Sequence, residues 1–242
     1  STLSDLSQYL LFGIKKGSQE AVSQQAQMEP IAIIGMSCHF PGDSSSPEAF
    51  WELLSTKKDG ISSIPEERWE KDAYPDIINK GGFIKNIDRF DASLFNISRR
   101  EAQVMDPQHR ILLELSFEAL ERAGIAPLSL QESNTGVFIG IASNDYSQLL
   151  REHLDNTDTY YGIGNAHSAA AGRIAYFLGT HGETIALDTA CSSSLKAIRD
   201  ACQSLVRGEC SMALAGGARV VVGGGRHALG GLDRYGKRRA VG

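Results

Sequence analysis

The sequence has no excess of positive charge, no long apolar run and no signal-peptide pattern. Its 242 residues include 24 Lys and Arg against 29 Asp and Glu, a net charge of -5, whereas a nucleic-acid-binding surface needs a basic stripe. No apolar run approaches the ~18–20 residues that cross a bilayer, and residues 1–27 lack a cationic start. These absences predict a cytoplasmic protein with neither a nucleic-acid nor a membrane partner.

Cysteine is scarce, and its spacing excludes the common metal patterns. Cys38, Cys191, Cys202 and Cys210 form no C-x-x-C pair and no zinc-ligand spacing with histidine. We therefore expect free thiols in a reducing compartment and no bound metal. A phosphate loop is absent, and GIGNAH (162–167) lacks the third glycine of a dinucleotide fingerprint. No directly bound cofactor is expected.

Strand and helix patterns alternate along the middle of the chain. Apolar, β-branched runs predict buried strands at 31–36, 135–142, 183–190 and 212–222. Helical periodicity predicts helices over 47–54, from Pro107 to a left-handed cap at Gly124, and over 168–178 and 192–206. This alternation predicts a layered α/β fold with a largely parallel sheet.

The two ends of the chain differ from its middle. Residues 1–28 indicate a short amphipathic helix followed by a linker rich in Gln, Ser and Ala. Residues 223–242 contain seven Gly, five Lys or Arg and one acid, which predicts a disordered or non-native tail. A frameshift, a truncation or an artificial end would each explain this tail. Because the chain begins with Ser1 rather than Met, we also expect it to be an internal or trimmed piece.

Cys191 lies where a predicted buried strand runs directly into a predicted amphipathic helix. Unpaired N–H groups and the positive end of the helix dipole stabilise a thiolate at such a position, which favours a nucleophile. The alternative is a small buried residue in an apolar segment, and that interpretation suits Cys202 and Cys210 better. The helix is expected to bury one apolar face, made of Leu195, Ile198, Ala201, Cys202 and Leu205.

The segment DTACSSSL (188–195) is similar to the active-site motif of polyketide ketosynthases. Five further segments match that family in the same order. They are EPIAIIGMSCHFPG (29–42), FDASLFNISRREAQVMDPQHRILLELSFEALERAGI (90–125), TGVFIGIASNDY (135–146), GNAHSAAAGRIAYFLG (164–179) and ACQSLVRGECSMALAGG (201–217). The region 29–222 thus resembles the N-terminal half of a ketosynthase domain of modular type I polyketide synthases, and animal-type fatty acid synthases share much of this pattern.

The resemblance implies a thiolase-like layered α/β fold, of which this chain is the first half. It also implies that Cys191 takes an acyl chain from the phosphopantetheine arm of an acyl carrier protein. Malonyl carrier protein then loses carbon dioxide, and its enolate attacks the acyl thioester to give a β-ketoacyl product. The complete domain would be a homodimer.

The family's two catalytic histidines lie in H-G-T-G-T and N-x-G-H motifs of the second half, and neither motif occurs here. Packing or solvated roles are expected for the six histidines present, which are His39, His109, His153, His167, His181 and His227. Two alternatives therefore stay open. Beside the ketosynthase itself, the chain could be an incompetent fragment that serves in binding or dimerisation, or a cysteine hydrolase, which would need a histidine base near Cys191.

Overall fold

The computed structural model describes residues 30–65, 68, 80–151 and 159–222. The chain divides into two units at Pro30, and the described residues from Ile31 onward belong to the second, Ile31–Gly242. The helix and linker expected over 1–28 and the tail expected over 223–242 lie outside the described residues. None of the described helices is both long and apolar enough to cross a membrane.

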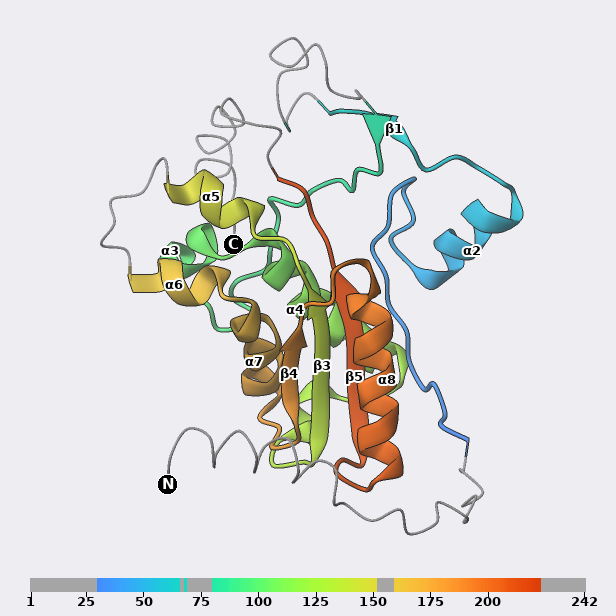
Figure 1. The fold of residues 1–242 in the computed structure, drawn as a ribbon, viewed down its shortest axis with the longest axis vertical. Coiled ribbons are helices and arrows are strands. Elements are labelled where there is room, and N and C mark those ends of the chain that lie inside the picture. The colour runs from blue at the N-terminus through green and yellow to red at the C-terminus, as the bar shows by residue number, and fades with distance from the viewer. Residues whose placement is uncertain (1–29, 66–67, 69–79, 152–158, 223–242) are drawn as a thin grey trace, which may run out of the picture. The chain divides into compact units, whose positions relative to one another are not determined.

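Three parallel strands form the central sheet, as the alternating pattern predicted. They are β3 (Thr135–Ile141), β4 (Thr184–Leu187) and β5 (Met212–Ala218), arranged in the order β4-β3-β5 (Figure 1). Gly140 pairs with Leu187 on one side, and Ile141 pairs with Ala218 on the other. The carboxyl ends of all three strands therefore meet at one edge of the sheet.

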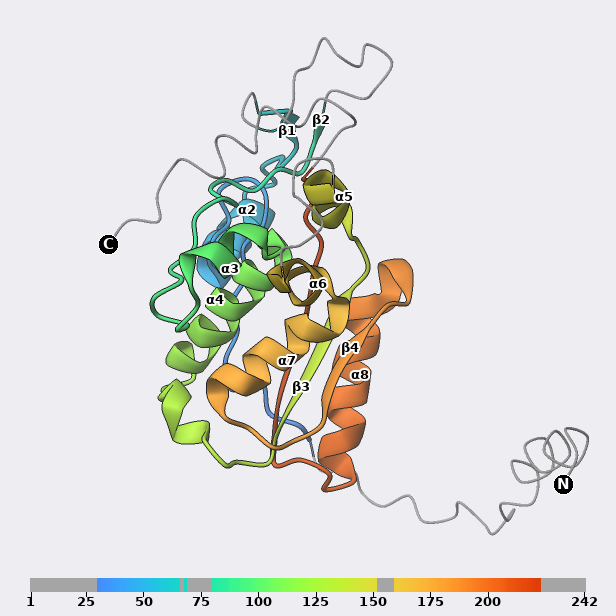
Figure 2. The same ribbon diagram turned by 90° about the vertical axis from the view of Figure 1, so that its left-hand side faces the viewer.

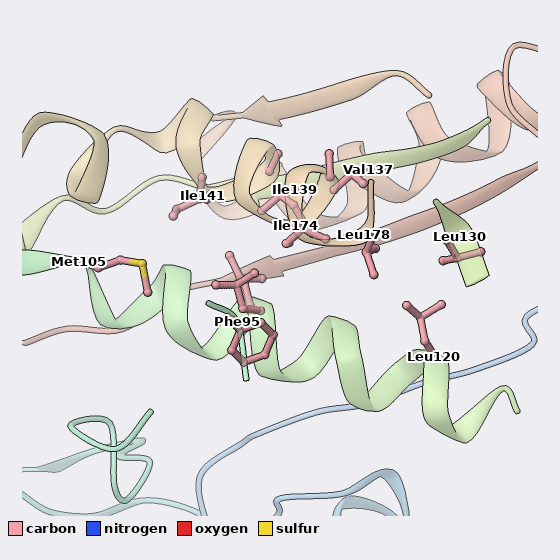
Figure 3. Packing of buried hydrophobic residues seen from close by; sticks show 14 residues of the cluster. Phe95, Met105, Leu120, Leu130, Val137, Ile139, Ile141, Ile174 and Leu178 are labelled. Carbon is pink, nitrogen blue, oxygen red and sulfur yellow. The ribbon is translucent and has the colours of Figure 1, made fainter. Parts of the chain in front are cut away.

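Helices cover both faces of the central strand, β3. Val137, Ile139 and Ile141 point toward α4 (Pro107–Arg122) and α7 (His167–Leu178), where the largest core cluster forms (Figure 3). Phe138 belongs to a separate cluster with Ala197 and Ala201 of α8 (Ser193–Val206). This helix lies on the opposite side of the sheet from α4 (Figure 2). Burial of every residue of β3 follows from this alternation.

The ends of α4 follow the expected capping chemistry. Pro107 is the first helical residue, and the Asp106 carboxylate accepts a hydrogen bond of 2.8 Å from the backbone N–H of Gln108. The helix stops before Gly124, whose φ of 71° is the left-handed conformation that glycine adopts without steric cost.

Shorter elements surround this core. Three of the described helices, α3 (Arg99–Val104), α5 (Asp145–Arg151) and α6 (Thr159–Asn165), escaped the sequence-based prediction because none is longer than about two turns. The described residues between 59 and 100 are largely irregular, as expected. The remaining elements are α2 (Pro47–Ser55), β1 (Ser62–Ser63), β2 (Lys80–Gly81), η2 (Pro127–Leu130) and η3 (Ala190–Ser192).

The strand expected over 31–36 is wrong. This segment pairs with no strand in the part of the chain that the structure describes, and Ile33 and Ile34 are 79% and 57% exposed rather than buried on both faces. It is instead fixed to α4, because the Ser37 hydroxyl donates to the Leu115 carbonyl and a side chain at Gly35 would meet the Ala119 carbonyl oxygen. An apolar, β-branched run predicts a strand only where a partner edge completes its hydrogen bonds.

The buried face expected for α8 is wrong in part: Ala201 is buried as expected, but Leu195 and Ile198 are not. Its buried residues are the small ones, Ser193, Ala197, Ala201 and Ser204. Leu195 and Ile198 point away from the sheet and are 70% and 46% exposed. The close approach of α8 to β3 leaves room for Ser and Ala only, so the larger apolar side chains occupy the opposite side of the helix.

Candidate active site at the strand-to-helix turn

Cys191 lies between the end of β4 and the start of α8, where the sequence placed it. Its side chain is exposed, which removes the alternative of a buried packing residue. The preceding residue, Ala190, has a φ of 55°, a left-handed conformation that costs a residue with a side chain about 1–2 kcal/mol. Such strain persists only where surrounding bonds enforce it, and it is frequent at functional turns.

Hydrogen bonds from the flanking polar residues hold this turn. The Asp188 carboxylate accepts from the Ala190 N–H at 2.9 Å. Ser192 Oγ donates to the Thr189 carbonyl at 2.8 Å, and Ser193 Oγ donates to the Ala190 carbonyl at 2.7 Å. The side chains of the motif residues on both sides of Cys191 therefore bond to the backbone of the turn and leave the thiol itself free.

Two glycines seat the start of α8 against the sheet. Gly140 of β3 and Gly217 of β5 are register partners. A Cβ at Gly140 would lie 2.5 Å from the Ser193 carbonyl carbon, and one at Gly217 would lie 2.8 Å from Ser194 Cβ. Only glycine permits this approach, and it brings the Cys191 turn onto the carboxyl edge of the sheet.

The N-terminus of α8 supplies the electrostatics of the site. Its N-cap residue, Ser192, makes no side-chain capping bond to the helix, so no capping side chain occupies the amides of the first turn. The backbone N–H groups of a first helical turn and the helix dipole favour negative charge at this end. The arrangement can support a thiolate on Cys191 and a developing oxyanion on a bound acyl group.

The other cysteines have packing positions. Cys38 and Cys210 are buried, Cys202 is partly buried, and all four thiols are free of disulfides. Burial, with the charge of Glu118 nearby, raises the pKa of the Cys38 thiol above its usual value.

No described histidine bonds to Cys191. His109 is buried with both ring nitrogens unpartnered, His167 Nε2 lies 3.1 Å from the Ser143 carbonyl oxygen, and His181 Nε2 lies 2.8 Å from a Glu132 carboxylate oxygen. His39 lines a cavity of about 340 Å³ that includes Asp43 and Lys85 but no residue of the Cys191 turn. His153 and His227 lie outside the described residues.

No group of three or more His, Cys, Asp or Glu side chains suited to a metal ion occurs among the described residues.

The positioning residues of the turn were missed by sequence reasoning. The DTACSSSL motif contains three of them, Thr189, Ser192 and Ser193. Two others, Gly140 and Gly217, are glycines inside predicted strands, and such glycines often mark a close backbone approach.

Comparison with known proteins decides the family. Residues 28–235 match the model of the β-ketoacyl synthase N-terminal domain. The chain belongs to the β-ketoacyl synthase family. Its relatives and structural neighbours place it, more narrowly, as the N-terminal domain of a modular polyketide ketosynthase, with the corresponding part of a thiolase-like α/β fold.

Two relatives illustrate the match to polyketide synthases. The chain is 46% identical over 212 residues to a phenolphthiocerol/phthiocerol polyketide synthase of Mycobacterium tuberculosis, covering 84% of this chain and 14% of that protein. It is 52% identical over 194 residues to erythronolide synthase EryA3 of Saccharopolyspora erythraea, covering 80% of this chain and 6% of that protein. The chain therefore spans a small part of the length of each relative.

Solved ketosynthases share its fold. The ketosynthase from module 6 of the bacillaene synthase of Bacillus subtilis 168 superposes with a TM-score of 0.72 at 39% identity, over 80% of this chain and 32% of that one. The oxazolomycin ketosynthase domain OzmH KS7 of Streptomyces albus gives a TM-score of 0.72 at 32% identity, over 84% and 36%. The chain thus corresponds to about a third of a solved ketosynthase chain.

Proposed function

We propose that Cys191 accepts the acyl chain in a polyketide ketosynthase. Its thiolate attacks the carbonyl carbon of an acyl thioester carried on the phosphopantetheine arm of an acyl carrier protein. A carbon–sulfur bond forms to Cys191 Sγ, and the bond to the phosphopantetheine sulfur breaks. That sulfur leaves with the electron pair and takes up a proton, so no resident cofactor is needed.

One observation carries this proposal. In a chain of the ketosynthase family, an exposed cysteine follows a left-handed residue at the N-terminus of α8. That position combines access for a carrier-bound thioester with amides that stabilise the attacking thiolate and the tetrahedral oxyanion. The geometry is that of a nucleophile elbow, in which a sharp strand-to-helix turn presents the attacking atom.

Condensation makes a further demand that this chain does not meet. Decarboxylation of a malonyl thioester needs donors around the developing enolate oxygen, and the two histidine motifs of the family are absent from the sequence. Losing one well-placed donor costs ~10²–10³ in rate. We therefore propose that this chain supports acyl transfer but not carbon–carbon bond formation, and that the complete domain, as a homodimer, supplies the rest.

A second candidate is a half-domain that only binds or dimerises. The missing histidine motifs and the exposed apolar side chains of α8 favour it. A cysteine hydrolase is disfavoured, because no described histidine lies in a hydrogen-bonding position to Cys191. Acylation of Cys191 distinguishes the proposed acyl acceptor from the pure binding element.

The test detects covalent acylation of Cys191. The chain is incubated with a hexanoyl-loaded acyl carrier protein and then with malonyl carrier protein, and peptides and products are read by mass spectrometry. We expect a hexanoyl mass on Cys191 and no β-ketoacyl product. Cys191→Ala should abolish the adduct, whereas Cys202→Ala, a cysteine on the same helix, should keep it.

An unmodified Cys191 in the wild-type chain would overturn acyl transfer and support the binding element. A β-ketoacyl product that disappears in Cys191→Ala would overturn the proposal that condensation needs the missing motifs.

A further inference from the structure

Gln108, the second residue of α4, connects three segments through one buried amide. Its side chain is 1% exposed. Nε2 donates to the Ser143 carbonyl at 3.0 Å and to the Asp106 carboxylate at 3.2 Å, while Oε1 accepts from Ser143 Oγ at 3.0 Å and from the Val220 N–H at 3.3 Å. Gln108 therefore joins the start of α4 to the loop after β3 and to the loop after β5.

Both loops lie at the edge of the sheet that carries Cys191. They begin directly after the register partners Ile141 and Ala218. Gly140, just before this pair, lies against the backbone of Ser193, two residues beyond Cys191. Ligands of parallel α/β sheets bind outside the carboxyl ends of the strands, so an acyl chain on Cys191 would lie beside these loops.

Side-chain hydrogen bonds hold the two loops in place. Residues 142–144 and 219–222 have no regular secondary structure. The Arg68 guanidinium donates to the Val221 carbonyl at 3.1 Å, and His167 Nε2 lies 3.1 Å from the Ser143 carbonyl oxygen. Arg68 reaches one loop and His167 the other, whereas Gln108 bonds to both.

We propose that Gln108 is a positioning residue, which holds the loops after β3 and β5 as the wall that an acyl chain on Cys191 contacts. The inference rests on the proposed acyl transfer. A glutamine amide donates and accepts at once, as the carbonyl of Ser143 and the N–H of Val220 require. A methionine has nearly the same length, donates no hydrogen bond and accepts only weakly, so Gln108→Met removes the bonds of this side chain to both loops without opening a large cavity.

The experiment compares two reactions of the same thiol. Alkylation by iodoacetamide needs the thiolate alone, whereas acylation by the N-acetylcysteamine thioester of hexanoic acid also needs the acyl group to be oriented. Because a misplacement of about 1 Å can cost ~10²-fold in an oriented reaction, we expect Gln108→Met to lower the acylation rate at least tenfold. Its alkylation rate should stay within about twofold of the wild-type rate, since the Cys191 turn is bonded independently of Gln108.

Two further variants serve as a second test and as a control. Ser143→Ala removes one hydrogen bond of the network and should lower acylation about two- to tenfold, the value of a single bond; it carries the test if Gln108→Met does not fold. Thr135→Val replaces a buried hydroxyl at the opposite, amino end of β3, where Thr135 bonds to Ser133. Thr135→Val should change neither rate.

The outcomes separate the two proposals. Selective loss of acylation in Gln108→Met and Ser143→Ala supports the positioning role. If the wild-type chain is acylated and both variants keep its rates, the positioning role is overturned and the proposed function stands. Equal losses of acylation and alkylation in the variants overturn the positioning role in the same way. A wild-type chain that is alkylated but not acylated overturns the proposed function and this inference with it.

Discussion

The four cysteines differ in how far solvent reaches their sulfur atoms. Cys191 is exposed at a helix N-terminus, Cys38 and Cys210 are buried, and Cys202 is partly buried. Because alkylation requires an accessible thiolate, we expect brief iodoacetamide treatment to label Cys191 first. Peptide mass spectrometry over a time course measures this order.

Cys191→Ala serves as the control and should remove the fast phase of alkylation. Labelling of Cys202 or Cys210 at the same rate as Cys191 would show that the position at the N-terminus of α8 gives the thiol no advantage.

His109 is a second residue whose chemistry is set by burial. Desolvation, with the charges of Arg173 and His167 nearby, lowers its pKa from 6.5 to about 3. In the unfolded chain His109 is therefore protonated as the pH falls through 6.5, whereas in the folded chain it stays neutral down to about pH 3. The stabilisation that neutral His109 gives is complete above pH 6.5 and is lost as the pH falls toward 3, at about 1.4 kcal/mol per pH unit.

The prediction compares wild type with His109→Gln by urea denaturation at pH 7.5, 6 and 5. Between pH 6 and 5 the wild type should lose about 1 kcal/mol more of its free energy of unfolding than the variant. Burial raises the pKa values of Asp106 and Glu114, which has the opposite effect on stability, but both residues are present in both proteins. Parallel pH profiles would contradict the prediction.

At the scale of elements, α8 turns its small residues to the sheet and its large apolar residues outward. Ala201 is 4% exposed and packs on Phe138, whereas Leu195 is 70% exposed. Ala201→Leu should therefore lower the free energy of unfolding by about 1–3 kcal/mol, the cost of overpacking a core. Leu195→Ala should change it by about 0.5 kcal/mol or less.

Chemical denaturation of both variants beside the wild type measures these differences. The face predicted from the sequence contains both residues and would make Leu195→Ala costly as well, so the value measured for Leu195→Ala distinguishes the two packings.

At the scale of the whole molecule, the chain exposes apolar side chains on more than one element. Ile33 and Ile34 in the segment after Pro30, and Leu195 and Ile198 on α8, are each at least 46% exposed. Because the chain matches 32% of a solved ketosynthase, we expect surfaces that a complete domain buries to be open here. Exposed apolar patches drive association, so sedimentation velocity should show oligomers that grow with protein concentration.

Substitution by charge tests which surface is responsible. A double variant, Leu195→Glu with Ile198→Glu, should weaken the association. Leu128 on η2 is also apolar and 72% exposed, and Leu128→Glu should leave the association unchanged. A clean monomer of the wild-type chain at all concentrations would refute the prediction.

The sequence alone determined the elements whose signals are local. The periodicity of α4 and α7, the proline at the start of α4, the glycine after it and the apolar run of β3 all predicted what the structure contains. The position of Cys191 was equally local, because one strand and one helix adjoin it in the chain. Collinear motifs indicated the family without any knowledge of the tertiary structure.

Only the tertiary structure decided which surfaces meet. The run 31–36 is apolar enough for a strand but has no partner edge among the described strands. The helix α8 buries alanine and serine because Gly140 and Gly217 bring the sheet close. The bonds from Gln108 to Ser143 and Val220 join residues 35 and 112 positions apart in the sequence. Such contacts leave no periodic trace in the sequence, since each depends on how separate elements pack together.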